Sequence, residues 1–161
     1  MNPYAAAVRS LGRTRGFAWV GSRVLHRLDA PFSRRRRSVT TFCTDFPLCY
    51  LTVTGRRSGE PRTVPLLHLA DGDRVVLIAS NWGRRRQPAW ALNLDAAQRA
   101  TVTVAGAPRE LSVRRATRAE FERYWGAALR IWPGYEGYRR RAGREIRLFV
   151  LEPCESAADV G

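Results

Sequence analysis

The sequence predicts a single α+β domain in which mainly antiparallel strands close into a small barrel, with helices packed outside it. Two observations favour this fold. Six short segments rich in β-branched and apolar residues follow one another, most of them joined by turn signals typical of hairpins. Few segments between them have helical periodicity. A length of 161 residues with 45% hydrophobic content suits one domain with its own core.

The first half of the barrel is expected from three consecutive strands. They are predicted over residues 49–54, 62–69 and 74–80. The segment GRRSGEP at residues 55–61 is a turn, so the first two strands should form a hairpin. Pro65 lies inside the second strand. Because proline cannot donate a ladder hydrogen bond, we expect a sheet edge or a bulge at this position.

The second half contains another hairpin, two helices and a last strand. The hairpin is predicted over residues 101–104 and 109–115, and the last strand over residues 145–151. Thr117 and Glu120 form a capping-box pattern that predicts the start of a helix, which should end at the WPG sequence of residues 132–134. A shorter helix is expected after Pro88, since proline is favoured in the first turn.

Residues 1–37 differ in composition from the rest of the chain. Phe17, Val20, Val24 and Leu28 recur at helical spacing among arginines, which predicts a basic amphipathic helix followed by an arginine-rich linker. Such a helix either lies on an anionic membrane surface or packs against its own domain, and the pattern leaves both open. The predicted organisation is this N-terminal segment, a barrel domain over residues 38–153 and a polar tail over residues 154–161.

The composition also bears on location. No segment has the roughly 20 apolar residues of a spanning helix, and the N-terminus has no signal-peptide pattern. The three cysteines cannot all pair. We therefore expect a cytoplasmic protein, peripheral at the inner face of the cell membrane if the N-terminal helix binds there.

Charge and missing motifs narrow the function. The 28 basic residues are all arginine, and with 14 acidic residues they give a formal net charge of +14. Such a charge favours a polyanionic partner: nucleic acid, an anionic membrane or an acidic small molecule. The chain has no P-loop, no G-x-G-x-x-G, no G-x-S-x-G elbow and no zinc-ligand spacing, so no metal site is predicted. An enzyme of this kind would need a bound organic cofactor.

Two loops concentrate anion-binding residues. Arg56, Arg57 and Arg62 flank the glycine-bounded turn, where backbone amides can add to the guanidinium groups. Arg84, Arg85 and Arg86 precede the predicted short helix. Each cluster alone is also what a solvated basic turn looks like.

Four blocks in order resemble the deazaflavin-dependent nitroreductase family. They are LTVTGRRSGEPRTVPL at residues 51–66, DGDRVVLIASN at 71–81, PAWALNL at 88–94 and WPGYEGYRRRAGREI at 132–146. The resemblance implies an FMN-binding split-barrel-like fold and reduced coenzyme F420 (F420H2). It further implies hydride transfer to a quinone, nitroaromatic or activated enone, and a separate dehydrogenase that reduces the cofactor.

The resemblance also implies site residues. Those that it places at the cofactor are Arg56, Arg57, Arg62, Thr63, Val64, Pro65, Leu66, Ser80, Asn81, Gly83, Arg86, Pro88, Ala89, Trp90 and Asn93. It gives catalytic roles to Ser80, Tyr135 and Tyr138, whose hydroxyls would stabilise charge on the acceptor. The acceptor pocket would be lined by Trp82, Trp132, Tyr135 and Tyr138. The chain departs from the family at Trp82, where a small residue is usual, and at Ala91 and Trp132.

Two other readings remain open on the sequence. A basic nucleic-acid-binding module would also suit the charge, but no reader motif is present and nucleic acid is not the expected partner. A split barrel could instead use FMN, less expected than F420, or carry a cofactor without turnover. The acceptor and the oligomeric state do not follow from the sequence.

Overall fold

The computed structural model describes residues 46–154, so the predicted N-terminal helix, the arginine run and the tail beyond residue 154 lie outside the described residues. The strands are β1 (Leu48–Thr54), β2 (Pro61–Asp71), β3 (Arg74–Ile78), β4 (Arg99–Val104), β5 (Ala107–Arg115) and β6 (Leu148–Pro153). The helical elements are η2 (Asn81–Gly83), α3 (Ala89–Ala96), α4 (Arg118–Ile131) and α5 (Gly134–Ala142).

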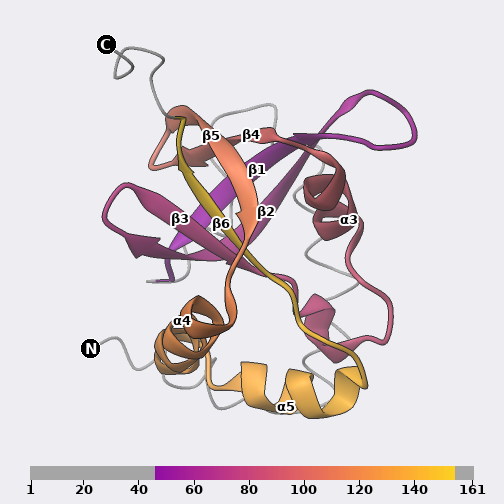
Figure 1. Cartoon of the computed structure of the whole chain (residues 1–161), viewed down its shortest axis with the longest axis vertical. Helices are drawn as coiled ribbons and strands as arrows, with labels where there is room; N and C mark the ends of the chain where they lie inside the picture. Colours follow the sequence, from indigo (N-terminus) through magenta and orange to yellow (C-terminus); the bar gives the residue numbers. More distant parts are fainter. Residues whose placement is uncertain (1–45, 155–161) are drawn as a thin grey trace.

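The strands close into one barrel in the order β1-β2-β3-β6-β5-β4, and β4 pairs back onto β1 (Figure 1). All of the pairings are antiparallel. The predicted split-barrel fold of the α+β class is therefore confirmed. Closure requires β6, the last strand in the chain, to lie between β3 and β5.

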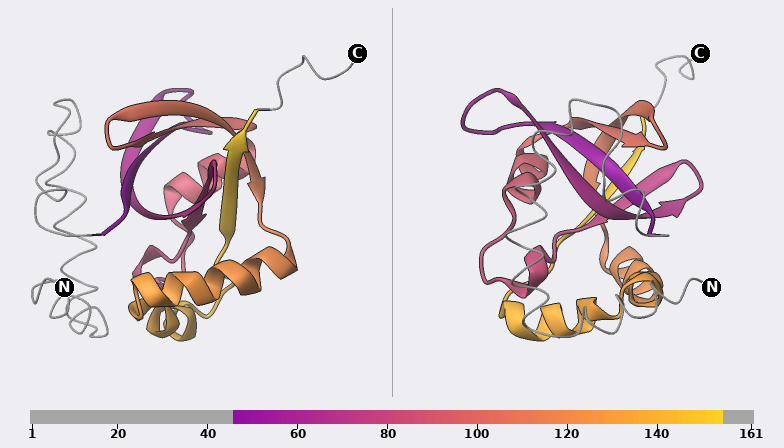
Figure 2. Two further views of the ribbon diagram at one scale, coloured as in Figure 1. Left: turned by 90° about the vertical axis from the view of Figure 1, so that its left-hand side faces the viewer. Right: turned by 180° about the vertical axis from the view of Figure 1, so that it is seen from behind.

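The barrel wall separates two apolar cores, because successive side chains of a strand point to opposite faces. Val75 and Leu77 face the barrel interior, whereas Val76 and Ile78 face the aromatic residues of α4 and α5. β3 is thus buried on both faces, which explains its unbroken apolar sequence. Figure 2 shows α4 and α5 side by side beneath the barrel, with α3 at its flank.

The helix start at Thr117 is as predicted. The Thr117 side chain accepts a hydrogen bond from the Glu120 amide, and the Glu120 carboxylate accepts one from the Thr117 amide at 2.8 Å. None of the helices within residues 46–154 is both long and apolar enough to cross a membrane.

Most strand boundaries, including those of β2, differ from the prediction by one to three residues, and the largest differences are in α5 and β6. The segment around Tyr135 and Tyr138 forms a complete helix, α5, which ends at Gly143 with φ 57°. The last strand begins at Leu148 rather than at residue 145, because the intervening residues are used to connect α5 to the barrel. Arg144 and Arg147 in this connection make polar contacts to neighbouring segments, which strand periodicity does not reveal.

Candidate functional site

The two predicted anion-binding loops lie along one side of the barrel, with α3 between them (Figure 1). The loop between β1 and β2 is closed by hydrogen bonds from the Gly55 amide to the Glu60 carbonyl and from the Gly59 amide to the Gly55 carbonyl, both 2.8 Å. Its Arg56 amide donates to Oδ1 of Asn93 on α3 at 3.2 Å. Asn93 is buried, so α3 fixes this loop against the barrel.

The arginines on these loops differ from those elsewhere in the molecule. Arg114, Arg115 and Arg123 all form ion pairs with carboxylates. Within residues 46–154, by contrast, no side-chain hydrogen bond or ion pair is made by the exposed residues Arg56, Arg57, Arg62, Arg85 and Arg86. Their charge is not neutralised by the residues that the structure describes and is available to an anionic ligand.

β2 supplies an open sheet edge beside these arginines. Among the strands of residues 46–154, residues 61–67 pair with β1 alone, whereas residues 68–71 pair with β3. The expectation of an edge at Pro65 is therefore confirmed. The His68 amide donates toward β1, to the Pro47 carbonyl, so by alternation Thr63 and Pro65 turn their backbone to the open edge.

The predicted run of residues 63–66 on β2 is divided between two faces. Val64 and Leu66 pack against the core inside the barrel. Thr63 lies on the outer face, where its hydroxyl shares a 2.8 Å hydrogen bond with that of Thr52. Only alternate side chains of the run can therefore line a surface groove.

The second loop contains three consecutive residues in the left-handed region: Asn81 (φ 47°), Trp82 (φ 58°) and Gly83 (φ 76°). Asparagine and glycine tolerate this conformation, but for tryptophan it is strained. Glycine at position 82 would adopt this conformation without that strain. Gly83 is also confined, since a Cβ there would lie 2.9 Å from Cα of Tyr138.

The predicted site residues at the start of α3 and within it differ in burial and in the parts of the molecule that they contact. Pro88 and Trp90 are buried, and Trp90 packs edge-on against Phe149 in the barrel core with ring centroids 6.0 Å apart. Ala89 is exposed. Asn93 is the residue of this helix that contacts the arginine loop.

The predicted acceptor residues lie in the apolar core between the outer face of the barrel and the helices α4 and α5. Trp82, Tyr138 and Tyr135 form a chain of ring contacts, with centroids 5.9 Å and 6.1 Å apart. This chain connects the strained loop to α5. Trp132 is buried beside them and donates its indole N–H to the Tyr138 hydroxyl at 3.2 Å.

The two tyrosine hydroxyls are not equivalent. That of Tyr138 accepts the indole hydrogen bond, whereas that of Tyr135 makes no hydrogen bond within residues 46–154. Burial raises the pKa of both phenols, so each stays protonated at neutral pH. Ser80 is partly buried, and its carbonyl accepts a hydrogen bond from the Gly83 amide at 2.9 Å.

One residue of this region was missed by the sequence analysis. Arg144, at the end of the fourth family block, donates hydrogen bonds to the loop of residues 79–87. Its position in the run RRRAGRE does not distinguish it from surface arginines. No sequence signal, taken without an alignment, could have separated it from them.

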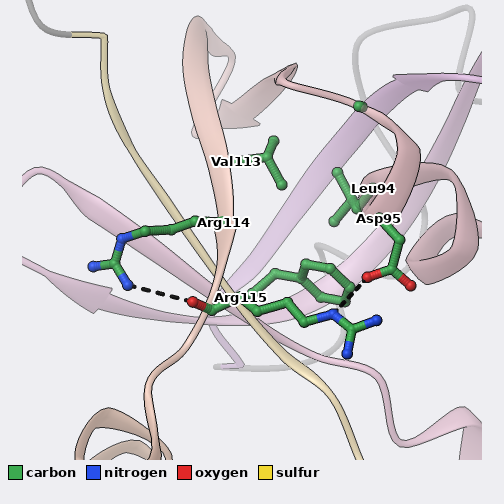
Figure 3. Close-up of a pocket in the computed structure, with 7 residues that line it drawn as sticks. Leu94, Asp95, Val113, Arg114 and Arg115 are labelled. Atoms are coloured by element: carbon green, nitrogen blue, oxygen red, sulfur yellow. Dashed lines mark hydrogen bonds and ion pairs between the residues drawn. The ribbon is translucent and has the colours of Figure 1, made fainter.

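A hollow of about 200 Å³ lies elsewhere, between α3 and β5, and none of the predicted site residues lines it (Figure 3). Asp95 lies at its rim and accepts hydrogen bonds from Arg115 at 2.7 Å and from Arg147. Nowhere in residues 46–154 are three or more His, Cys, Asp or Glu side chains grouped so that they could hold a metal ion.

Comparisons with known proteins agree with this geometry. An F420H(2)-dependent quinone reductase of Mycobacterium tuberculosis is 29% identical over 113 residues, which cover 65% of this chain and 72% of the relative. The solved F420-H2 dependent reductase FDR-A has 28% identity and a TM-score of 0.61, covering 66% of this chain and 94% of its own.

A more distant structure shows the fold alone. The heme storage protein HutZ from Vibrio cholerae has 11% identity and a TM-score of 0.53, covering 80% of this chain and 92% of its own. The family model described as F420H(2)-dependent quinone reductase matches residues 25–153. The chain therefore belongs to the F420H(2)-dependent quinone reductase family, and reduced coenzyme F420 is its cofactor.

Proposed function

We propose that this oxidoreductase passes a hydride, supplied by bound F420H2, to a quinone, with nitroaromatics and activated enones as further acceptors. The observation that carries the proposal is the row of unpartnered arginines on two loops that flank α3. F420 carries a phosphate and a chain of glutamates. Planar guanidinium groups bind both kinds of anion in a bidentate manner, so the residues present fit this cofactor.

The arginines bind the anionic part of the cofactor. Arg56, Arg57 and Arg62 hold the phosphate and acidic tail from the β1–β2 side, and Arg86 adds a contact from the other loop. The buried side chain of Asn93 holds the β1–β2 loop in position, because its Oδ1 accepts a hydrogen bond from the backbone amide of Arg56. Positive charge held in place before binding lowers the cost of ordering the site.

The open edge of β2 forms the seat for the ring system. Thr63 and Pro65 turn unpaired backbone toward it, and Val64 and Leu66 brace the same wall from inside the barrel. Ser80, Asn81 and Gly83 continue the groove on the second loop. An open ladder edge offers hydrogen-bonding groups to a flat polar ligand without displacing another strand.

Tyr135 and Ser80 are the groups that we assign to the acceptor. Within residues 46–154, Tyr135 makes ring contacts with Trp125 and Tyr138, and the raised pKa of its hydroxyl keeps the proton available. A phenol donor of this kind stabilises negative charge that develops on a quinone or nitro oxygen. Trp82 and Tyr138 shape the pocket, and Trp132 holds Tyr138 in place.

Titration of the full-length protein tests the cofactor assignment. We expect F420 to bind more tightly than FMN, because FMN lacks the glutamate chain, and its affinity to fall as salt screens the arginines. The double variant Arg56→Ala/Arg57→Ala should weaken F420 binding about 10-fold or more, given two lost charge-assisted contacts.

A matched control removes the same charge elsewhere. Arg118 and Arg130 on α4 are exposed and make no side-chain hydrogen bond or ion pair within residues 46–154. Arg118→Ala/Arg130→Ala should leave F420 affinity near the wild-type value. Equal losses in the two double variants would mean that net charge, not a site, binds the cofactor. Absence of F420 binding together with tight single-stranded RNA binding would favour the nucleic-acid module instead.

A panel of acceptors tests the reaction. Menadione, a nitroaromatic and an activated enone are each mixed with the protein and pre-reduced F420H2, and oxidation of the cofactor is followed by its absorbance. We expect the quinone to be reduced with the highest kcat/KM. If the protein binds F420H2 but reduces none of the three acceptors, its function would be that of a cofactor carrier.

A further inference from the structure

Arg144 makes five side-chain hydrogen bonds, and four of them go to the loop of residues 79–87. Its Nη2 donates to the carbonyls of Ala79 at 3.2 Å and Ser80 at 3.3 Å, and its Nε donates to the carbonyl of Arg84 at 3.1 Å. Its Nη1 donates to Oε1 of Gln87 and to the Glu145 carbonyl, both at 2.9 Å. One side chain thus spans both ends of the loop that carries Ser80, Asn81, Gly83 and Arg86.

All of these acceptors are neutral. No carboxylate is paired with Arg144 within residues 46–154, unlike Arg114 or Arg115. Arg144 is only partly exposed, and its burial together with the nearby Arg147 lowers the pKa of its guanidinium. A partly buried cation without a counter-ion costs free energy, so its place here must be compensated by the hydrogen bonds that it makes.

The loop itself requires such support. Around its three left-handed residues, the backbone makes short-range hydrogen bonds from the Gly83 amide to the Ser80 carbonyl at 2.9 Å and from the Arg84 amide to the Asn81 carbonyl at 3.0 Å, and the Ala79 amide at the start of the loop donates to the Arg147 carbonyl at 2.9 Å. The Asn81 side chain adds one bond to the Arg86 carbonyl at 2.8 Å. A strained backbone persists only where its surroundings over-determine it, and Arg144 contributes four hydrogen bonds from outside the loop, at both of its ends.

We infer that Arg144 is a positioning residue that fixes the loop of residues 79–87 in the shape that receives F420. The inference has two halves: Arg144 holds the loop, and the loop so held receives F420. Only the second half rests on the proposed function. The first half, that Arg144 holds the loop, concerns the free protein. The fork of five N–H donors explains why arginine serves here, since lysine has three donors at a single point.

Hydrogen exchange in the free, full-length protein tests the first half. In Arg144→Ala, the amides of Gly83 and Arg84 should exchange about 10-fold faster or more, because a charged donor network has been removed. Amides of β1 and β4 should keep their wild-type rates. The matched control is Arg140→Ala, an exposed residue of α5 without side-chain hydrogen bonds or ion pairs in the described chain. Unchanged exchange at Gly83 and Arg84 in Arg144→Ala would overturn the inference.

Two milder variants cover the case in which Arg144→Ala does not fold. Arg144→Lys keeps the charge but loses the fork, so loop exchange should stay faster than in the wild type. Gln87→Ala removes one acceptor of Arg144 and its own bond to the Glu145 carbonyl, and should loosen the same amides to a smaller degree. Full restoration of loop protection by Arg144→Lys would show that a cation is sufficient and would refute the role of the guanidinium fork, whereas wild-type exchange in both Arg144→Ala and Gln87→Ala would refute the positioning role.

F420 titration tests the second half. Arg144→Ala should bind F420 about 10-fold more weakly, with an unchanged salt dependence, since the arginines that contact the anion remain in place. Faster loop exchange with wild-type F420 affinity would refute the link to the cofactor. If the wild type itself fails to bind F420, the proposed function fails, whereas the exchange result still decides the role of Arg144 in the loop.

Discussion

Two tyrosines one helical turn apart on α5 have hydroxyls in opposite states. Tyr138 accepts a hydrogen bond from the Trp132 indole, and Tyr135 has no partner in residues 46–154. Removal of the Tyr138 hydroxyl breaks its hydrogen bond with the buried Trp132 indole, whereas removal of the Tyr135 hydroxyl breaks no hydrogen bond within residues 46–154. The same chemical change should therefore have different consequences at the two positions.

Tyr135→Phe should lower kcat/KM with a quinone on the order of 100-fold, as expected for one lost donor to developing charge. Its melting temperature should stay near that of the wild type. Tyr138→Phe should instead lower the free energy of unfolding by about 0.5–1.5 kcal/mol, because it removes the hydrogen bond to the buried Trp132 indole. Steady-state kinetics and urea unfolding on both variants measure this, and a Tyr135→Phe enzyme with full activity would remove Tyr135 from the mechanism.

Gly83 allows the strained loop to approach α5. A Cβ at this position would lie 2.9 Å from Cα and 3.1 Å from the carbonyl oxygen of Tyr138, in a residue with φ 76°. Gly83→Ala should therefore destabilise the protein by about 2–3 kcal/mol, from strain and overpacking together. Urea unfolding checks the value. Gly106→Ala is the comparison, because Gly106 also has positive φ but has open space around its Cβ position, and it should cost less.

At the residue level, sequence reasoning finds side chains whose role follows from local position and misses those that act at a distance. Arg56 and Arg57 are recognisable because they stand in a glycine-bounded turn. Arg144, by contrast, contacts loop residues that precede it in the sequence by 57 to 65 positions. Whether an arginine is paired or free depends on which carboxylate the fold brings near it, and a single sequence does not contain that information.

Among the elements, α4 was predictable because its start signal is local. Thr117 and Glu120 are three residues apart and satisfy each other's backbone amides. α5 was not, since its few apolar side chains are buried only once the fold brings them against the barrel wall, α4 and the loop that carries Trp82. The strand boundaries of β2 and β6 shifted for a similar reason: register with a neighbouring strand, rather than propensity, decides where a strand ends.

The start of α4 also predicts an acid sensitivity. Glu120 accepts a bidentate pair of 2.8 Å hydrogen bonds from Arg114, and this pairing lowers the pKa of its carboxyl to about 2. A carboxyl with a lowered folded-state pKa stabilises the protein above its unfolded value, near 4.5, and this contribution disappears as the pH falls towards 2.

Glu120→Gln tests this contribution. The difference in free energy of unfolding between wild type and Glu120→Gln should be largest above pH 5 and should shrink between about pH 4.5 and pH 2. Urea unfolding at a series of pH values measures it. A difference that stays constant across this range would mean that the ionised carboxylate does not stabilise the folded state.

At the scale of the whole molecule, the barrel topology was predicted because consecutive hairpins leave few alternatives. The position of β6 between β3 and β5 closes the barrel, and it brings the connection of residues 143–147 against the loop of residues 79–87. A large part of the candidate site is therefore completed by the last segment of the fold. Local signals identify its loops, but only the closed barrel brings Arg144 to them.

Barrel closure depends on a strand that is buried on both faces. Leu77 of β3 is fully buried in the inner core, opposite Phe149 of β6. Leu77→Ala should lower the free energy of unfolding by about 2–5 kcal/mol, the usual cost of a cavity at a closed site. Urea unfolding checks this value, with Leu92→Ala, a partly exposed leucine of α3, as the milder comparison.

The open edge of β2 has a consequence for the behaviour of the protein in concentrated solution. A row of unpaired strand groups is a template onto which a second chain can add, which is a common route to aggregation. Pro65 turns its backbone to this edge and has no N–H to offer an incoming strand, while Arg62 at the start of β2 adds repulsive charge. The edge can thus stay open for a small ligand and still discourage association between copies.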